Sequence, residues 1–114
     1  MTPRYRVVIH ASERDRAALA LNNAKNLIAG LGAERVEAEV VAYADGVEGL
    51  RAGGPNAALM DLLASYGTRF VVCANTLRSR NLTAKDFPGY VETVPSGVVE
   101  LVVRQAEGWC YIRP

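Results

Sequence analysis

The 114-residue chain has one histidine and two cysteines, so it lacks the cysteine and histidine spacing from which zinc sites are built. It has no apolar run approaching the roughly 18 residues of a membrane span. Its formal net charge is +1, with both signs mixed along the chain, which does not indicate a basic surface for nucleic acid. We therefore expect no metal, no membrane association and no nucleic-acid partner.

Common catalytic and nucleotide-binding motifs are also missing. The chain contains no GxxxxGK[ST] or GxGxxG phosphate loop and no GxSxG nucleophile elbow. With these motifs and a catalytic triad absent, neither a hydrolase nor a bound cofactor is expected. The first residues run straight into a charged, strand-like segment without a signal-peptide pattern, so the expected location is cytoplasmic, with reduced thiols.

What the chain does contain is a regular alternation of strand and helix patterns. Apolar, β-rich runs predict strands at residues 6–11, 36–43, 70–76, 90–94 and 109–113. Helical spacing predicts helices at 13–31, 56–66 and 97–108, with single helical turns near 47–51 and 83–86. The valines of 97–108 would also suit a strand, but Glu100, Arg104 and Glu107 form one polar stripe at helical spacing. The alternation predicts one α/β domain over residues 1–114, with a parallel sheet and helices on both faces.

Polar residues mark where these elements begin. Ser12 is placed to cap the first helix and Asn56 the second. Thr83 and Asp86 have the spacing of a capping box. The second helix is expected to turn four side chains inward, those of Leu59, Leu62, Leu63 and Tyr66.

Cys73 lies near the carboxyl end of the predicted strand 70–76, where the chain changes from apolar to polar residues. Ligands of parallel α/β sheets bind at this edge. Backbone amides of a following turn can stabilise a thiolate there, and Arg78 and Arg80 add positive charge nearby. Two interpretations remain open, because free cysteines also commonly fill hydrophobic cores.

Other polar residues are expected at the same edge of the sheet. His10 ends the first strand and titrates near neutral pH, so it would either assist proton transfer or only make a loop hydrogen bond. The start of the last helix, Ser96-Gly97, offers amides for an anion. The candidate binding residues around Cys73 are therefore His10, Asp45, Asn75, Thr76, Ser96 and Gly97.

Cys110 falls early in its strand, near the opposite edge of a parallel sheet. At about 3.3 Å per residue, the two cysteines should lie beyond the roughly 6 Å Cα separation of a disulfide. We expect no disulfide within one chain and a structural role for Cys110. The helix 97–108 is apolar almost all round, so we expect a second subunit to cover its outer side.

Several segments together resemble the DsrE/DsrF-like family. They are residues 40–47, 66–77, 94–101 and 107–114, and the more specific pieces are Cys-x-Asn-Thr-Leu at 73–77 and Val-Pro-Ser-Gly at 94–97. The resemblance implies a three-layer α/β/α fold on a five-stranded, mainly parallel sheet. It implies homo-oligomers, often trimers or hexamers. It also implies that Cys73 lies where family members in sulfur oxidation and tRNA thiolation carry sulfur as a persulfide.

These observations lead to two hypotheses. In the first, the chain is a sulfur carrier or sulfurtransferase in which Cys73 takes up a sulfane sulfur and passes it to another thiol, with a donor or acceptor protein as partner. In the second, it is a non-catalytic small-ligand-binding or interaction module of the same fold, and the thiol is incidental.

Overall fold

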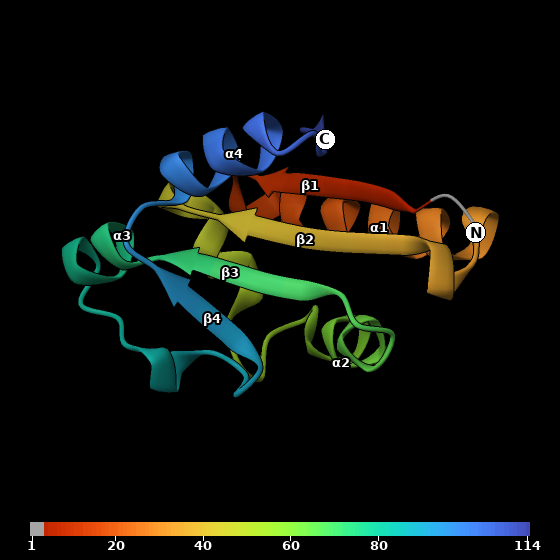
Figure 1. The fold of residues 1–114 in the computed structure, drawn as a ribbon. Coiled ribbons are helices and arrows are strands. Elements are labelled where there is room, and N and C mark those ends of the chain that lie inside the picture. The colour runs from red at the N-terminus through yellow and green to blue at the C-terminus, as the bar shows by residue number, and fades with distance from the viewer. Residues whose placement is uncertain (1–3) are drawn as a thin grey trace.

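Strands and helices alternate in the computed structural model, which describes residues 4–114, and build a five-stranded parallel sheet between helices (Figure 1). The strands are β1 (Tyr5–Ala11), β2 (Val36–Ala42), β3 (Arg69–Cys73), β4 (Val91–Val94) and β5 (Cys110–Ile112). The helices are α1 (Ala17–Leu31), α2 (Ala57–Ser65), α3 (Ala74–Ser79) and α4 (Gly97–Ala106). Short 3₁₀ turns occupy Arg14–Arg16, Ala33–Arg35, Ala44–Leu50 and Ala84–Asp86. The predicted α/β/α fold is confirmed.

The strand order is β4-β3-β2-β1-β5, and every neighbouring pair is parallel. Ala11, Ala42 and Val72 are aligned at the carboxyl ends of the three central strands. One residue further along, Cys73 of β3 is paired with Val94 of β4. The carboxyl ends therefore meet at one edge, from which α3 and α4 begin.

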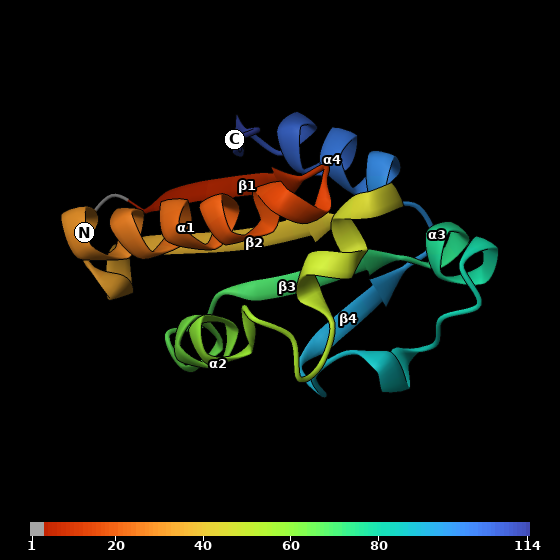
Figure 2. The ribbon, with the colours of Figure 1, turned by 180° about the vertical axis from the view of Figure 1, so that it is seen from behind.

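Two hydrophobic cores lie on the two faces of the sheet. Seen from behind, α1 and α2 cover one face (Figure 2), and the larger core lies between them and the sheet. On the other face, α4 covers a smaller core formed by Val8, Val41, Val71, Leu101 and Trp109. Because side chains alternate along a strand, Val71 and Cys73 both point to the α4 face.

The 3₁₀ turn Ala44–Leu50 passes directly over the carboxyl end of β1. A Cβ atom at Gly46 would lie 1.8 Å from the carbonyl oxygen of Ala11, so only glycine fits there. This contact holds the chain that follows β2 close to the edge where Cys73 lies.

Two of the predicted helix caps are wrong, and one is confirmed. The first helical segment begins with a 3₁₀ turn, and the Ser12 hydroxyl instead accepts a hydrogen bond from Arg113 Nε at 3.3 Å. The Asn56 amide donates to the Gly49 carbonyl at 2.9 Å, which ties it to the preceding turn. Thr83 and Asp86 form the expected capping box.

Three further expectations need correction. Leu62 and Tyr66 are about half exposed, because α2 buries only a narrow stripe containing Met60 and Leu63. Residues 74–76 do not extend the strand or form a loop, since α3 begins directly after Cys73. Cys110, for which a structural role was expected, is exposed, because it opens a three-residue strand at the edge of the sheet.

Candidate functional site around Cys73

Cys73 is the last residue of β3 and the first residue before α3. Its side chain is only 5% exposed. The backbone N–H groups of Gly97, Thr76 and Asn75 and the hydroxyl of Thr76 lie around the sulfur, where they can donate to a thiolate. These donors come from the first turns of two helices, α3 and α4, which meet at the carboxyl edge of the sheet.

The donors decide the charge state of the thiol. Burial alone would raise the pKa of Cys73, since the interior disfavours a charged sulfur. The amides of Gly97, Thr76 and Asn75 and the Thr76 hydroxyl outweigh burial, so the pKa lies below its ordinary value. A thiolate is the form that reacts with sulfur electrophiles, and this arrangement increases the thiolate fraction relative to an ordinary buried cysteine.

Two residues that follow β2 hold this group of donors. The backbone N–H of Ala44 donates to the Thr76 hydroxyl oxygen at 2.9 Å, with Ala44 in the left-handed region at φ 51°. The ring of Tyr43 lies against Gly97, where an added Cβ would come within 2.6 Å of Tyr43 Cδ1. The first residue of α4 therefore packs against the Tyr43 ring, next to the sulfur.

His10 lies on the same face, next to Tyr43. The two rings are stacked with centroids 4.8 Å apart, and His10 Nδ1 shares a 2.8 Å hydrogen bond with the Tyr111 hydroxyl. The ring is buried, and its Nε2 has no hydrogen-bond partner among the residues described. Burial and the positive charge of Arg113 lower the pKa of His10, so the ring is neutral near pH 7.

The other candidate residues have different partners. Asp45 accepts a hydrogen bond from the Arg14 amide at 3.0 Å and lies 3.5 Å from Arg80 Nη1. Ser96 precedes α4 and its side chain makes no capping bond. The Asn75 side chain accepts a hydrogen bond from Arg78, so only its backbone amide serves the thiol. The structure therefore gathers Asn75, Thr76 and Gly97 directly around Cys73.

Tyr43 and Ala44 were not recognised from the sequence. A weak signal for Tyr43 exists, because continued alternation beyond Val41 places its side chain on the same face as Cys73. Ala44 carries no such signal, since alanine rarely adopts positive φ.

The two cysteines are both free. Cys110 is paired with Val7 near the start of β1, and β1 and β2 separate its strand from that of Cys73. This separation agrees with the expectation that they form no disulfide within the chain.

A charged network lies deeper on the same face, under α4. Glu39 of β2 is fully buried and lies 2.9 Å from Arg69 Nη1 and 3.1 Å from Arg104 Nη2. Arg104 also pairs with Glu100 and Glu107, and its guanidinium lies over the Trp109 ring. These contacts fasten the last turn of α4 to the sheet.

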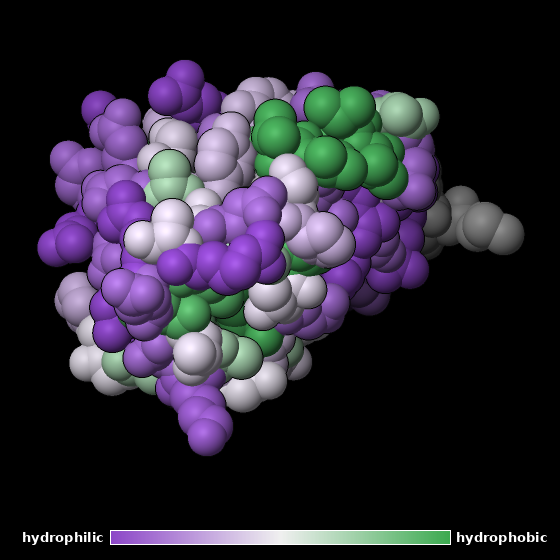
Figure 3. All heavy atoms as spheres, turned by 90° about the vertical axis from the view of Figure 1, so that its left-hand side faces the viewer, coloured by the Kyte–Doolittle hydropathy of each residue, from purple (hydrophilic) through white to green (hydrophobic). Residues whose placement is uncertain are grey.

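The outer side of α4 is hydrophobic and uncovered. Its exposed side chains include four valines, Val98, Val99, Val102 and Val103, each between 44% and 61% exposed. Figure 3, which views the carboxyl edge, shows a continuous hydrophobic patch at the upper right. We call these four residues the valine patch.

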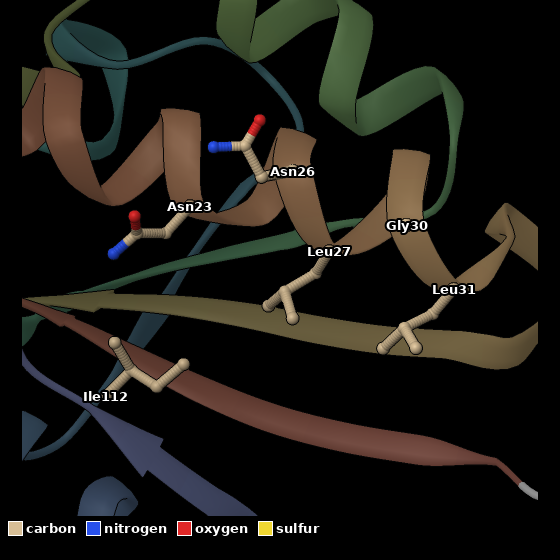
Figure 4. A pocket seen from close by; sticks show the side chains of 6 residues that line it. All are labelled: Asn23, Asn26, Leu27, Gly30, Leu31 and Ile112. Carbon is tan, nitrogen blue, oxygen red and sulfur yellow. The ribbon is translucent and has the colours of Figure 1, made fainter.

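A separate hollow of about 460 Å³ lies beside α1, on the opposite face from the thiol. In Figure 4, Leu27 and Leu31 point from α1 toward the sheet, where Ile112 of β5 faces them. Asn23, Asn26 and Gly30 complete the lining, which contains no charged residue.

Within residues 4–114, no three histidine, cysteine or acidic side chains are grouped so as to hold a metal ion. None of the helices in that part of the chain is both long and apolar enough to cross a membrane.

Comparisons with known proteins agree with the fold. A solved structure of a protein of unknown function, MTH1491 from Methanobacterium thermoautotrophicum, is 44% identical, with a TM-score of 0.89 over 96% of this chain and 99% of that one. The ychN protein from E. coli has the same fold at 18% identity, with a TM-score of 0.80 over 96% and 99% of the two chains. Among curated proteins, no match is found. The model of the DsrE/DsrF-like family matches residues 5–114, and the chain therefore belongs to that family.

Proposed function

We propose that this protein carries sulfane sulfur as a persulfide on Cys73. The family to which it belongs is associated with sulfur relay. The observation that carries the proposal is the set of three backbone amides and one hydroxyl directed at a single buried sulfur. A core cysteine needs no such donors, whereas a thiolate or a persulfide anion does.

The transfer is a pair of balanced exchange steps. The Cys73 thiolate attacks a sulfane sulfur of hydrogen disulfide, HS–SH; a new S–S bond forms, the old one breaks, and hydrosulfide leaves with the electron pair. An acceptor thiolate then attacks the outer sulfur of the Cys73 persulfide, and the Cys73 thiolate is the leaving group. A low leaving-group pKa favours this second step.

The burial of Cys73 restricts the donor. With 5% of the residue exposed, a slender inorganic sulfane reaches the sulfur more easily than a cysteine held on a folded partner. We therefore propose hydropolysulfide as the direct donor, and a protein donor only where the first turns of α3 and α4 separate.

The test is intact-mass spectrometry on a Cys110→Ser background, which removes the exposed thiol. After incubation with hydropolysulfide, the protein should gain one sulfur atom that a reductant removes. The matched Cys73→Ala variant should gain none. A gain that persists without Cys73, or no gain in its presence, contradicts the proposal.

The valine patch supports a homo-oligomer, expected as a trimer or hexamer from the family. Monomeric proteins rarely expose a contiguous apolar patch without a use for it. The patch lies on one straight face of α4, and a second copy offers the same uncharged surface. We propose that α4 packs against another copy of the chain.

The hollow beside α1 supports a second candidate function, a small-ligand-binding module in which Cys73 is incidental. Its uncharged lining of leucine, isoleucine and asparagine suits a neutral molecule with an apolar body. A ligand that co-purifies and raises the melting temperature equally in the Cys73→Ser variant favours this candidate over sulfur transfer.

A further inference from the structure

We infer that Tyr43 and Ala44 are positioning residues for the Cys73 thiolate, each holding one of the donors that contact the sulfur. The inference rests on the proposed function, because it takes Cys73 as the reactive thiol. It concerns how the Cys73 thiol is ionised and not which substrate donates the sulfane sulfur. Tyr43 contacts Gly97 and Ala44 contacts Thr76, so the two residues act on the sulfur through these donors.

Tyr43 acts through packing. A Cβ at Gly97 would lie 2.6 Å from Cδ1, 3.0 Å from Cβ and 3.1 Å from Cγ of Tyr43, so the Gly97 backbone rests directly on the ring. Gly97 is also the residue whose N–H reaches Cys73 from α4. The position of the ring therefore sets how closely the first amide of α4 approaches the sulfur.

The ring of Tyr43 is itself held from behind. It stacks on His10 at an interplanar angle of 19°, and His10 is fixed by its hydrogen bond to Tyr111 at 2.8 Å. His10 lies on β1 and Tyr111 on β5, so two neighbouring strands support the ring of Tyr43. In this arrangement His10 contributes as a support, with Tyr43 between it and Gly97.

Ala44 acts by orienting the hydroxyl proton of Thr76 toward Cys73. A hydroxyl has one proton to donate, and its oxygen accepts hydrogen bonds through lone pairs. The Ala44 N–H occupies the Thr76 oxygen at 2.9 Å, which leaves the Thr76 proton to point at Cys73. Ala44 holds a left-handed conformation, φ 51°, to make this bond. Such strained backbone is found preferentially at functional sites.

The experiment measures the apparent pKa of Cys73 from the pH dependence of alkylation, in protein that also carries Cys110→Ser. Tyr43→Ala removes the ring and should raise the apparent pKa by about one pH unit, which lowers the thiolate fraction about tenfold at pH values well below both midpoints. The rate should fall only about threefold, because a more basic thiolate is a better nucleophile. Tyr43→Phe keeps the stacked ring and should leave the apparent pKa unchanged.

Tyr43→Leu serves as a second variant, with circular dichroism and melting temperature confirming that each protein is folded. If a folded variant without the ring keeps the wild-type apparent pKa, the role given to Tyr43 is wrong. This result is independent of sulfur transfer, because alkylation needs no sulfur donor; failure to form a persulfide would overturn the proposed function alone.

Ala44 is tested by following its amide resonance in an NMR pH titration. In the parent protein the Ala44 amide should titrate with the same midpoint as the Cys73 thiol, because the Thr76 hydroxyl links them. Thr76→Ser keeps a hydroxyl and should preserve this response, whereas Thr76→Val should abolish it. If the Ala44 amide chemical shift in the parent protein does not change with the ionisation of Cys73, the inference is wrong.

Discussion

Arg104 of α4 and Glu39 of β2 form an ion pair beneath the helix, with Arg104 Nη2 3.1 Å from Glu39 Oε2. Glu39 is fully buried, whereas Arg104 retains some contact with solvent. Burial raises the pKa of Glu39 to about 7, with a further contribution from the neighbouring Glu100 carboxyl and an opposing one from Arg104. The last turn of α4 is thus held by a carboxyl group that changes charge near neutral pH.

The first prediction concerns stability against pH. A carboxyl whose pKa is raised by folding stabilises the native state fully below its unfolded pKa, and this contribution is lost as pH rises through the folded value. A rise in the pKa of Glu39 from 4.5 to about 7 on folding corresponds to a contribution of about 3 kcal/mol to the free energy of unfolding. We expect the free energy of unfolding of the wild type, relative to that of Glu39→Gln, to decrease between pH 5 and pH 8.

Urea unfolding at pH 5, 6, 7 and 8 would measure this difference. Glu39→Gln keeps the shape of the side chain and removes its titration. Parallel pH profiles for the two proteins would show that Glu39 does not titrate in this range.

The second prediction concerns the ionisation of Cys73 in the Cys110→Ser protein. Its alkylation should follow a pKa below the value of about 8.5 seen for a free cysteine, because the amide and hydroxyl donors outweigh burial. Iodoacetamide labelling across pH, with N-acetylcysteine as the reference thiol, measures the midpoint. A midpoint above the reference would mean that burial dominates and that Cys73 belongs to the core.

The third prediction tests the valine patch. Val102 is the most exposed of the four valines, at 61%. Val102→Glu should leave the fold intact and dissociate the proposed oligomer, because burying a carboxylate between two apolar helices is costly. Sedimentation velocity reports the change in mass. Leu19→Glu makes the same change at an exposed leucine of α1 and should keep the assembly; equal behaviour of the two variants would exclude the patch as the interface.

The fourth prediction compares two glycines. Gly30 lies inside α1 with nothing within 4 Å of an added Cβ, so Gly30→Ala should stabilise the protein by about 0.5 to 1 kcal/mol through helix propensity. Gly46→Ala would place a Cβ 1.8 Å from the Ala11 carbonyl oxygen and should cost about 3 kcal/mol or more. Chemical denaturation measures both. A neutral Gly46→Ala would mean that the turn over β1 adjusts freely.

Local patterns were enough to predict the strands, the main helices and the edge at which Cys73 lies. Cys73 and Gly97 are separated by 23 residues in the chain, yet both were expected at this edge because the carboxyl ends of parallel strands meet there. The helical character of 97–108 followed from a single stripe of three charged residues, all of which pair through Arg104.

What the patterns could not predict depends on tertiary neighbours. The strand order follows from how five similar apolar strands pack, and their compositions do not distinguish it. The exposure of Cys110 depends on its position in an edge strand. The left-handed turn at Ala44 depends on contacts with Thr76 and with the end of β1, which no local rule for alanine describes.

The donors described around the Cys73 sulfur, Asn75, Thr76 and Gly97, belong to the same polypeptide as the sulfur itself. A single copy of the chain, with no neighbour packed on α4, would therefore keep these donors around the sulfur. Separating the copies, by dilution or by a charge on α4, should therefore leave the reactivity of Cys73 unchanged. Assembly and thiol reactivity can then be altered independently.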